Sequence, residues 1–333
     1  MSDDPIQFPR DQYAHALAAN EWWWHIGTLK AGGRVFGFEV NAAKRSISGM
    51  NITFSEVMVT DVESQIHYEA SNVFPFDAGW AEVDPGKPWR VSLGSPGGNG
   101  AVLMTSDSSD AQTMQVDSSF VDAATGKSVT ISLRLAQQGA PLLVWGTGVS
   151  PEIGTPGADP MDSHNYYYSF TRLRASGKIT IGSDSFDVTG VTWMDHEYGV
   201  FPQSTTWVLQ DAQLDNGIHL SCFATKGAPV ENVAMPSQVT ILSAEGASSF
   251  HDSVTTPSGP IWTSPEGIAY CTVFDVKIPD IDAELRFTSL MPDQEFKSQI
   301  APVYEGVAGV KGTVAGKDVT GTAWIEQALK SLP

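Results

Sequence analysis

The heptapeptide DVTGVTW at residues 187–193 occurs again, nearly unchanged, as DVTGTAW at residues 318–324. Five of the seven positions are identical. A second pair of matches opens each half of the chain, because Trp, Leu and Gly at positions 22, 29 and 32 have the same spacing as Trp, Leu and Gly at positions 207, 214 and 217. Self-similarity of this kind indicates a repeated structural unit. We therefore predict two similar units in tandem, with longer loops in the first.

The segments between these matches alternate apolar with polar residues, as in VTISLRL (129–135), GIHLSCF (217–223) and CTVFDVKI (271–278). A period of two indicates β-strands with one buried face, and 31 Gly and 20 Pro provide the turns. Many short antiparallel strands predict a barrel or a sandwich. Helix signals are confined to residues 13–20, with Asp11 as the cap, and to a short piece at 328–332.

The composition limits the classes of partner. The chain has 333 residues, with 19 Lys and Arg against 38 Asp and Glu, and hence a net charge of −19. Such a charge repels nucleic acid and anionic lipid. Because 41% of the residues are hydrophobic and none of the apolar runs is long enough to span a membrane, we expect a folded, soluble, cytoplasmic protein without stable membrane insertion. In that reducing compartment Cys222 and Cys271 should be buried free thiols.

The end of the first unit carries two carboxylates. If residues 193–198 form a strand, Trp193, Asp195 and Glu197 share one face and the residues between them share the other. Two carboxylates about 7 Å apart that face an apolar barrel interior could not both stay ionised cheaply, so at least one would hold a proton and could act as a general acid. The alternative is that this face is hydrated surface. In the second copy Glu326 occupies the position of Asp195.

Aromatic residues supply further candidates. On a strand, Tyr166 and Tyr168 would share a face and could line a pocket with Trp193, although ordinary packing of a sheet is the better explanation for either tyrosine taken singly. Trp23 and His25 share a face in the same way. His25 is a candidate proton carrier, with a satisfied core histidine as the alternative.

At these residues the sequence resembles a known family. The motifs are WWWHIG (22–27), YYSFTR (167–172), WMDHEYG (193–199), Trp207 followed by LDNG (214–217), and YEG (304–306) followed by VTG (319–321). Together, and in this order, they resemble the carotenoid 1,2-hydratase-like or AttH-type family of two lipocalin-like domains. That family includes hydratases that add water to a carbon–carbon double bond of a polyene or prenyl chain, and fungal relatives that catalyse Diels–Alder cyclisation.

The resemblance implies roles for particular residues. Asp195 would be the hydratase acid, and Trp193 its aromatic partner. The His and Trp used upstream by the carotenoid hydratases fall on Tyr166 and Tyr168, so the proton relay would differ here.

We therefore expect an all-β protein of two tandem lipocalin-like antiparallel barrels, with an N-terminal arm and short helix at 1–21 and barrels at 22–200 and 201–333. The ligand cavity would lie between or within the barrels. No local zinc-binding pair, G-x-S-x-G elbow, phosphate loop or dinucleotide fingerprint is present in the sequence, so we expect no metal and no cofactor.

The expected function is acid-assisted hydration, dehydration or cyclisation of an apolar isoprenoid or polyketide-type small molecule in secondary metabolism. The alternatives are a pericyclase without proton transfer and a non-catalytic ligand-binding protein. Weak homo-oligomerisation is compatible with this function. The predicted catalytic residues are Asp195, Glu197, Tyr166, Tyr168 and His25, and the predicted substrate-binding residues are Trp23, Trp193, Trp207, Gln210 and Arg172.

Overall fold

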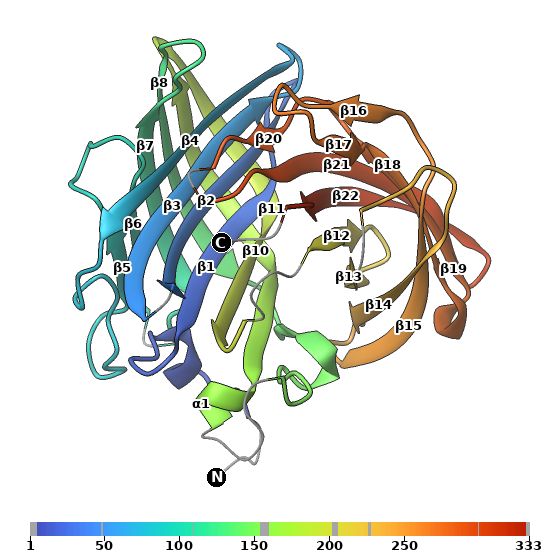
Figure 1. Ribbon diagram of the computed structural model, residues 1–333, viewed down its shortest axis with the longest axis horizontal. Coiled ribbons are helices and arrows are strands. Elements are labelled where there is room, and N and C mark those ends of the chain that lie inside the picture. Colours follow the sequence, from blue (N-terminus) through green and yellow to red (C-terminus); the bar gives the residue numbers. More distant parts are fainter. Residues whose placement is uncertain are drawn as a thin grey trace.

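Nearly all of the regular structure is β (Figure 1). The computed structural model describes residues 5–47, 49–108, 110–153, 160–201, 206–225, 228–298 and 300–330. Within them, helical elements are limited to three 3-10 turns and one short helix. These are η1 (Arg10–Gln12), η2 (Val144–Gly146), η3 (Pro279–Ile281) and α1 (Pro160–Ser163).

Strands from the first part of the chain form a single antiparallel sheet that curls into a nearly closed barrel. The neighbour order along the sheet is β4-β3-β2-β1-β11-β10-β8-β7-β6-β5, and β9 pairs with β10. The bounds are β1 (Asn20–Ala31), β2 (Arg34–Ile47), β3 (Met50–Asp61), β4 (Ile66–Pro75), β5 (Arg90–Leu93), β6 (Ala101–Thr105), β7 (Thr113–Val121), β8 (Ser128–Gln137), β9 (Leu142–Leu143), β10 (Asn165–Ile181) and β11 (Asp184–Gly199).

The remaining strands form a second barrel, which closes because β19 pairs with β21. The neighbour order is β19-β18-β15-β14-β13-β12-β22-β21-β20, with a separate hairpin of β16 and β17. The bounds are β12 (Trp207–Leu214), β13 (His219–Ala224), β14 (Met235–Leu242), β15 (Ser248–Pro257), β16 (Ile261–Thr263), β17 (Ala269–Cys271), β18 (Val273–Ile278), β19 (Ala283–Ser289), β20 (Glu295–Phe296), β21 (Val303–Val314) and β22 (Lys317–Ala328).

Burial along the strands shows where the two barrels touch. β8 alternates strictly between exposed and buried residues, because one of its faces meets water. In contrast, β2 is buried on both faces over most of its length, since one face packs into the first barrel and the other against the second. At this contact a Cβ on Gly37 would lie 2.7 Å from Val307, so only glycine permits the close approach of β2 to β21. Figure 1 shows the barrels side by side, joined along β1, β2, β21 and β22.

A β-bulge on β10 supplies a polar link between the barrels. The register of β10 against β11 shifts between Phe170 and Leu173, and this frees the backbone carbonyl of Thr171 from the ladder. The side-chain amide of Gln213 donates to that carbonyl at 2.6 Å. From the same bulge, Arg172 donates to the carbonyl oxygens of Gly217 and Ser243 at 2.8 and 2.9 Å. The bulge therefore ties the second barrel to the first.

The N-terminal arm differs in detail from the sequence prediction. Its helical part is the single turn η1, and residues 13–19 are irregular, so the two-turn helix predicted at 13–20 is wrong. Asp11 does not cap a helix there, because its carboxylate accepts hydrogen bonds from Gln7 and Arg10 and lies near His15. At the other end β22 continues to Ala328, and residues 331 and 332 of the predicted C-terminal piece lie outside the described residues.

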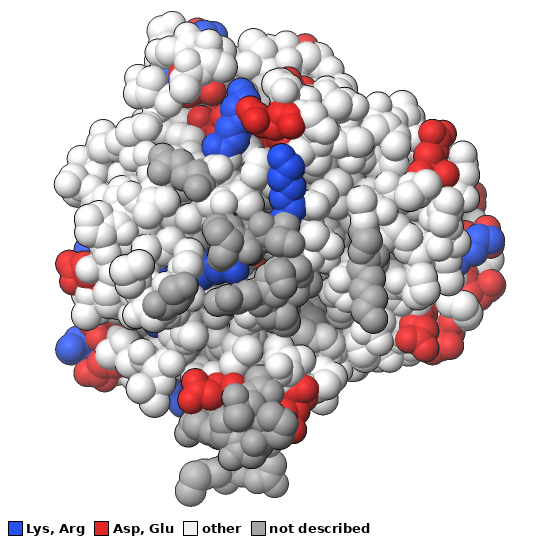
Figure 2. All heavy atoms as spheres, in the orientation of Figure 1, with Lys and Arg blue, Asp and Glu red and all other residues white. Residues whose placement is uncertain are grey.

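Two further sequence expectations concern cysteines and membrane helices. Cys222 and Cys271 are buried free thiols, as predicted. Among the described residues no helix combines the length and apolar character needed to cross a bilayer. On the face seen in Figure 2, acidic side chains form separate groups, most of them near the edge of the molecule. Part of the acidic excess is instead buried between the barrels, as described next.

Candidate active site between the two barrels

A cavity of about 500 Å³ lies between the outer faces of the two barrels. This volume is in the range of small-molecule sites. Its wall is mostly apolar and rich in aromatic rings, and a few polar side chains reach into it. The aromatic residues on the wall are Trp22, Trp24, Phe54, Trp145, Tyr167, Phe201, Trp207 and Phe223, and the acidic residues are Glu56, Asp195, Glu197 and Glu326.

The internal repeat explains how the cavity is built. Each copy opens with a tryptophan, and both Trp22 and Trp207 line the cavity. Each copy closes with an acid two residues after a tryptophan, and both acids, Asp195 and Glu326, line it too. Equivalent faces of the two barrels are therefore turned toward each other. The repeated acid and the repeated tryptophan of each copy therefore meet in a single chamber.

Asp195 is the most thoroughly positioned of the acids. It is buried on β11, and its Oδ1 accepts hydrogen bonds from the hydroxyl of Ser169 at 2.5 Å and from the indole Nε1 of Trp193 at 2.8 Å. Burial raises the pKa of Asp195 to about 6, and hydrogen bonds from Ser169, Trp193 and Tyr167 limit this rise. These donors hold the carboxyl group of Asp195 in one orientation at the edge of the cavity.

The neighbouring acids hold their protons more firmly. Burial raises the pKa of Glu326 to about 8 and that of Glu56 to about 7. The pKa of Glu197 is raised well above its usual range by burial and by the charges of Asp195 and Glu326, against a hydrogen bond from the amide of Asn165. The main influence on the pKa of Asp195 is burial rather than the charge of Glu197.

Such a site can donate protons without a metal ligand set. Near neutral pH several of its carboxyls are protonated, and a neutral carboxylic acid in an apolar chamber is a general acid and a strong hydrogen-bond donor. The faces of Trp22, Trp24 and Trp207 can stabilise positive charge on a bound molecule. The prediction that Asp195 and Glu197 share one face of their strand is confirmed, since both line the cavity whereas Met194 packs in the core of the first barrel. The prediction that this face points into the barrel interior is wrong, because it is the outer face of the first barrel.

Tyr166 and Tyr168 do not face the cavity, so their predicted pocket-lining position is wrong. In the pairing of β10 with β11, Tyr167 lies opposite Glu197, and directly paired residues share a face of an antiparallel sheet. Tyr167 therefore lines the cavity. Tyr168 points into the first barrel, where its hydroxyl donates to the side chain of Gln12, and Tyr166 stacks on Tyr198 on the same side.

Trp23 and His25 also lie on the other side of their sheet. Trp23 is fully buried inside the first barrel and stacks on His196, and the residues on either side of it, Trp22 and Trp24, face the cavity instead. His25 is enclosed in the same interior, where burial lowers its pKa to about 3. This placement does not suit a proton carrier at the cavity.

The other predicted binding residues have mixed positions. Trp207 lines the cavity and its indole nitrogen donates to Glu326. Trp193 packs between the barrels and reaches the cavity only through its hydrogen bond to Asp195. Gln210 is buried inside the second barrel, where its carbonyl oxygen accepts from Thr255, and Arg172 links the barrels through backbone carbonyls. Neither of these two residues borders the cavity.

Sequence reasoning missed several residues that line the cavity. The signal for Glu326 was present in the repeat, and alternation along the first strand could have identified Trp22 and Trp24. Glu56 on β3 and Arg45 on β2 carried no signal, because nothing local distinguishes them from other charged residues in strands. They come to the cavity only through the pairing of β1, β2 and β3.

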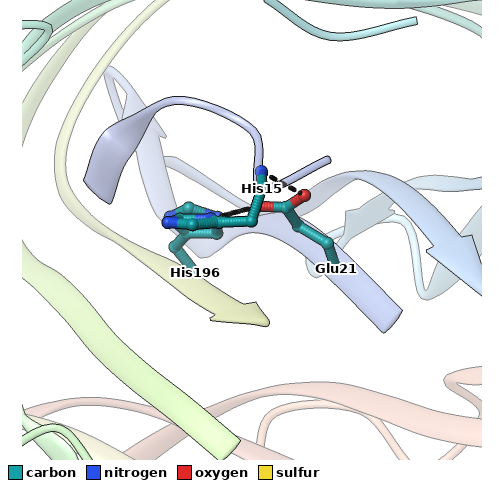
Figure 3. Close-up of side chains that lie close together, drawn as sticks. All are labelled: His15, Glu21 and His196. Atoms are coloured by element: carbon teal, nitrogen blue, oxygen red, sulfur yellow. Dashed lines mark hydrogen bonds and ion pairs between the residues drawn. The ribbon is translucent and has the colours of Figure 1, made fainter. Parts of the chain in front are cut away.

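A second cluster of titratable groups lies under the N-terminal arm, away from the cavity (Figure 3). His15, Glu21 and His196 present ligand-type atoms within 4.8 Å of one another. In the structure these atoms bond to each other: the ring of His15 lies 2.8 Å from Glu21, and that of His196 lies 3.1 Å from the same oxygen. The second nitrogen of His196 contacts the hydroxyl of Tyr168 at 3.0 Å. The cluster thus fastens the arm to the first barrel.

Because His15 carries a positive charge, the attachment of the N-terminal arm to the first barrel should weaken at high pH. Burial alone would lower the pKa of His15, but its bonds to Asp11 and Glu21 outweigh burial and raise the pKa to about 9. Its contribution is therefore complete below its ordinary pKa of about 6.5 and is lost as the pH rises toward 9. We expect the protection factors of amides across residues 5–19, which are corrected for the intrinsic base-catalysed exchange rate, to be much lower at about pH 9.5 than at about pH 6, corresponding to a loss on the order of 2 kcal/mol.

Two variants check the assignment to His15. His15→Gln should exchange rapidly in the arm at both pH values, because the amide cannot carry the charge. His251→Gln removes a histidine that pairs with Asp280 on the second barrel and should leave the arm unchanged. Equal protection of the wild-type arm at both pH values would contradict the prediction.

Comparisons with known proteins agree on the fold. The chain resembles the solved structure of a putative AttH from Nitrosomonas europaea, with a TM-score of 0.77 at 21% identity over 99% of this chain and 98% of the other. It resembles kievitone hydratase from Nectria haematococca with a TM-score of 0.73 at 17% identity over 98% and 94%. CghA matches with a TM-score of 0.54 at 12% identity over 99% and 96%. None of the curated proteins matches the chain.

At such low identities a structural likeness shows the fold alone. The family rests on a separate finding, because the AttH-like family model matches residues 1–328. This span contains both barrels and every residue of the cavity wall. The two-barrel fold, the facing repeats and this match together show that the chain belongs to the AttH-like family.

Proposed function

We propose that this protein is an enzyme that transfers a proton to an apolar isoprenoid or polyketide-type molecule. The proton goes to a carbon–carbon double bond in hydration or cyclisation, and to a hydroxyl group in the reverse dehydration. The observation that carries the proposal is Asp195, a buried acid with a raised pKa that borders a largely apolar cavity of about 500 Å³. A hydrocarbon chain fits such a wall, and a double bond needs a strong, desolvated acid to accept a proton.

The proposed step begins with transfer of the proton from Asp195 to one carbon of the double bond. The other carbon then carries the positive charge, which faces the rings of Trp22, Trp24 and Trp207 and the carboxylate that Asp195 has become. Water adds to the cation and returns a proton to Asp195, so the net reaction is addition of one water molecule. The reverse sequence is dehydration. Capture of the cation by a second double bond, followed by loss of a proton from the new cation to Asp195, is cyclisation.

The protonated neighbours support this step by keeping the site nearly neutral. Glu197 and Glu326 have raised pKa values, and they can orient water or a carbonyl group through their hydroxyl protons. One structure of the same fold is named a hydratase, which is in keeping with the proposal. The same neutral carboxyls favour a second candidate, a pericyclase that folds a polyene and activates its carbonyl by a hydrogen bond without protonating carbon.

Isotope labelling separates these candidates. Prenylated phenols and conjugated polyenes would be incubated with the protein in D₂O containing H₂¹⁸O, and the products would be analysed by mass spectrometry. Proton addition predicts one carbon-bound deuterium, accompanied by ¹⁸O in a hydration. A cyclised product without carbon-bound deuterium would favour the pericyclase. Binding of the compounds, seen as quenching of tryptophan fluorescence, with no change in any of them would favour a binding protein.

A further inference from the structure

Arg45 is a buried cation at the cavity for which the protein supplies no counter-ion. It is 6% exposed and lines the cavity from β2. Among the described residues it makes no ion pair and donates no side-chain hydrogen bond, although the chain has twice as many acidic as basic residues. A guanidinium has five N–H donors, and those of Arg45 are accessible from the cavity and have no acceptor among the described side chains. A ligand in the cavity that carries an anionic oxygen could accept from them.

The strand register directs Arg45 toward the cavity. It pairs with Asn20 of β1, which also lines the cavity, and directly paired side chains share one face. Its neighbour Lys44 also borders the cavity, but it pairs with Glu21 on the opposite face, where the carboxylate of Glu21 attracts its charge. Arg45 is thus the cation on the cavity face of β2 that has no acidic partner among the described residues.

The cavity is therefore divided between a basic end and an acidic end. Asp195 pairs with Trp24, which pairs with Asn41, so Asp195 lies two strands from β2. Arg45 is four residues further along β2 than Asn41. Two strand spacings of about 4.8 Å and a rise of about 13 Å place the Cα atoms of Asp195 and Arg45 on the order of 16 Å apart. Aromatic rings line the space between these two ends.

We propose that Arg45 anchors an oxyanion, such as a carboxylate, at one end of an otherwise apolar substrate, whose reacting double bond then lies at Asp195. This inference rests on the proposed function, because it takes the cavity as the ligand site. A planar guanidinium binds a carboxylate through two parallel hydrogen bonds, which gives orientation as well as affinity. An anion is tolerated in a cavity with four acids because most of them are protonated near neutral pH.

The test compares three probes with the same apolar chain and different ends: octanoate, 1-octanol and n-octylamine. Binding is followed at pH 7 through the fluorescence of the tryptophans on the cavity wall. Wild type should bind octanoate most tightly and octylamine least. Arg45→Gln should weaken octanoate binding by about 10-fold or more, the range for hydrogen bonds to a charged group, and should change octanol binding little.

Controls distinguish a ligand role from a structural one. Arg174→Gln removes the same charge from an exposed position on β10 and should leave the order of affinities unchanged. Arg45→Lys keeps the charge without the planar fork and should retain a weakened preference for octanoate. Because Arg45 has no described partner to lose, Arg45→Gln should unfold at the wild-type temperature or above it. A clear fall in that temperature would show a structural role and overturn the proposal.

The remaining outcomes distinguish failure of the Arg45 anchor from failure of the cavity as a ligand site. If all three probes bind wild type equally, or octylamine binds best, the anchor is wrong while the cavity remains a ligand site. If Arg45→Gln leaves the preference for octanoate intact, the anchor is wrong as well. If no probe binds, the cavity is not the ligand site, and the proposed function falls with it.

Discussion

Replacing Asp195 by Asn is expected to lower turnover by a factor of roughly 10² to 10⁴ while leaving ligand affinity nearly unchanged, because this is the usual range for loss of a general acid. Asn has the same shape, and its carbonyl oxygen can still accept the hydrogen bonds from Ser169 and Trp193. It has no acidic proton to give to carbon. Turnover would be measured with the substrate found by labelling, and affinity by quenching of tryptophan fluorescence.

The matched control uses the internal repeat. Glu326 is the equivalent acid of the second copy and lines the same cavity, so Glu326→Gln removes a proton from the same chamber. We expect this variant to retain most of the turnover, because one indole positions Glu326 whereas a hydroxyl and an indole both position Asp195. If Glu326→Gln abolishes turnover and Asp195→Asn does not, the proton donor has been assigned to the wrong copy. If neither variant matters, the pericyclase is favoured.

The second large effect is on stability, which should fall as the pH rises from about 5 to about 9. In the unfolded chain the carboxyls ionise at their ordinary pKa values near 4. In the folded chain Asp195, Glu56 and Glu326 stay protonated up to a pH of about 6, 7 and 8. The folded state therefore binds more protons over this range, and the stability present below pH 4 is lost as the pH rises through the folded values.

The expected loss is on the order of 4 kcal/mol, which is less than the separate shifts would sum to because these acids interact with one another. Urea unfolding at a series of pH values would measure it. Glu326→Gln and Glu56→Gln should each flatten the curve, whereas Glu284→Gln, at an exposed acid on β19, should not. His15→Gln should retain the loss below about pH 8, which separates the cavity acids from the N-terminal arm.

Added salt tests whether the pH dependence of stability comes from the buried carboxyls or from repulsion among surface charges. Repulsion among surface charges is screened at high ionic strength, but the burial of a carboxyl is not. The pH dependence should therefore persist in about 0.5 M NaCl. Disappearance of the dependence in salt would assign it to the net charge of −19 rather than to the cavity.

The side-chain positions that were predicted correctly follow from patterns within the sequence itself. Alternation along a strand is local, so it placed Asp195 and Glu197 on one face and separated them from Met194. The repeat predicted two similar barrels and marked Glu326 as the counterpart of Asp195. The same rule could say that Tyr166 and Tyr167 face opposite ways, but it could not say which of them faces the cavity.

That choice belongs to the tertiary structure, because it depends on how strands distant in the sequence pair. The register of β10 against β11 sets Tyr167 beside Glu197, and the bulge after Phe170 turns Arg172 toward the second barrel. The docking of the two barrels then decided that the chamber lies between them. Through the pairing of β1, β2 and β3 it also brought Glu56 and Arg45 to the cavity, since a side chain's partners follow from the packing of whole sheets and not from its neighbours in the chain.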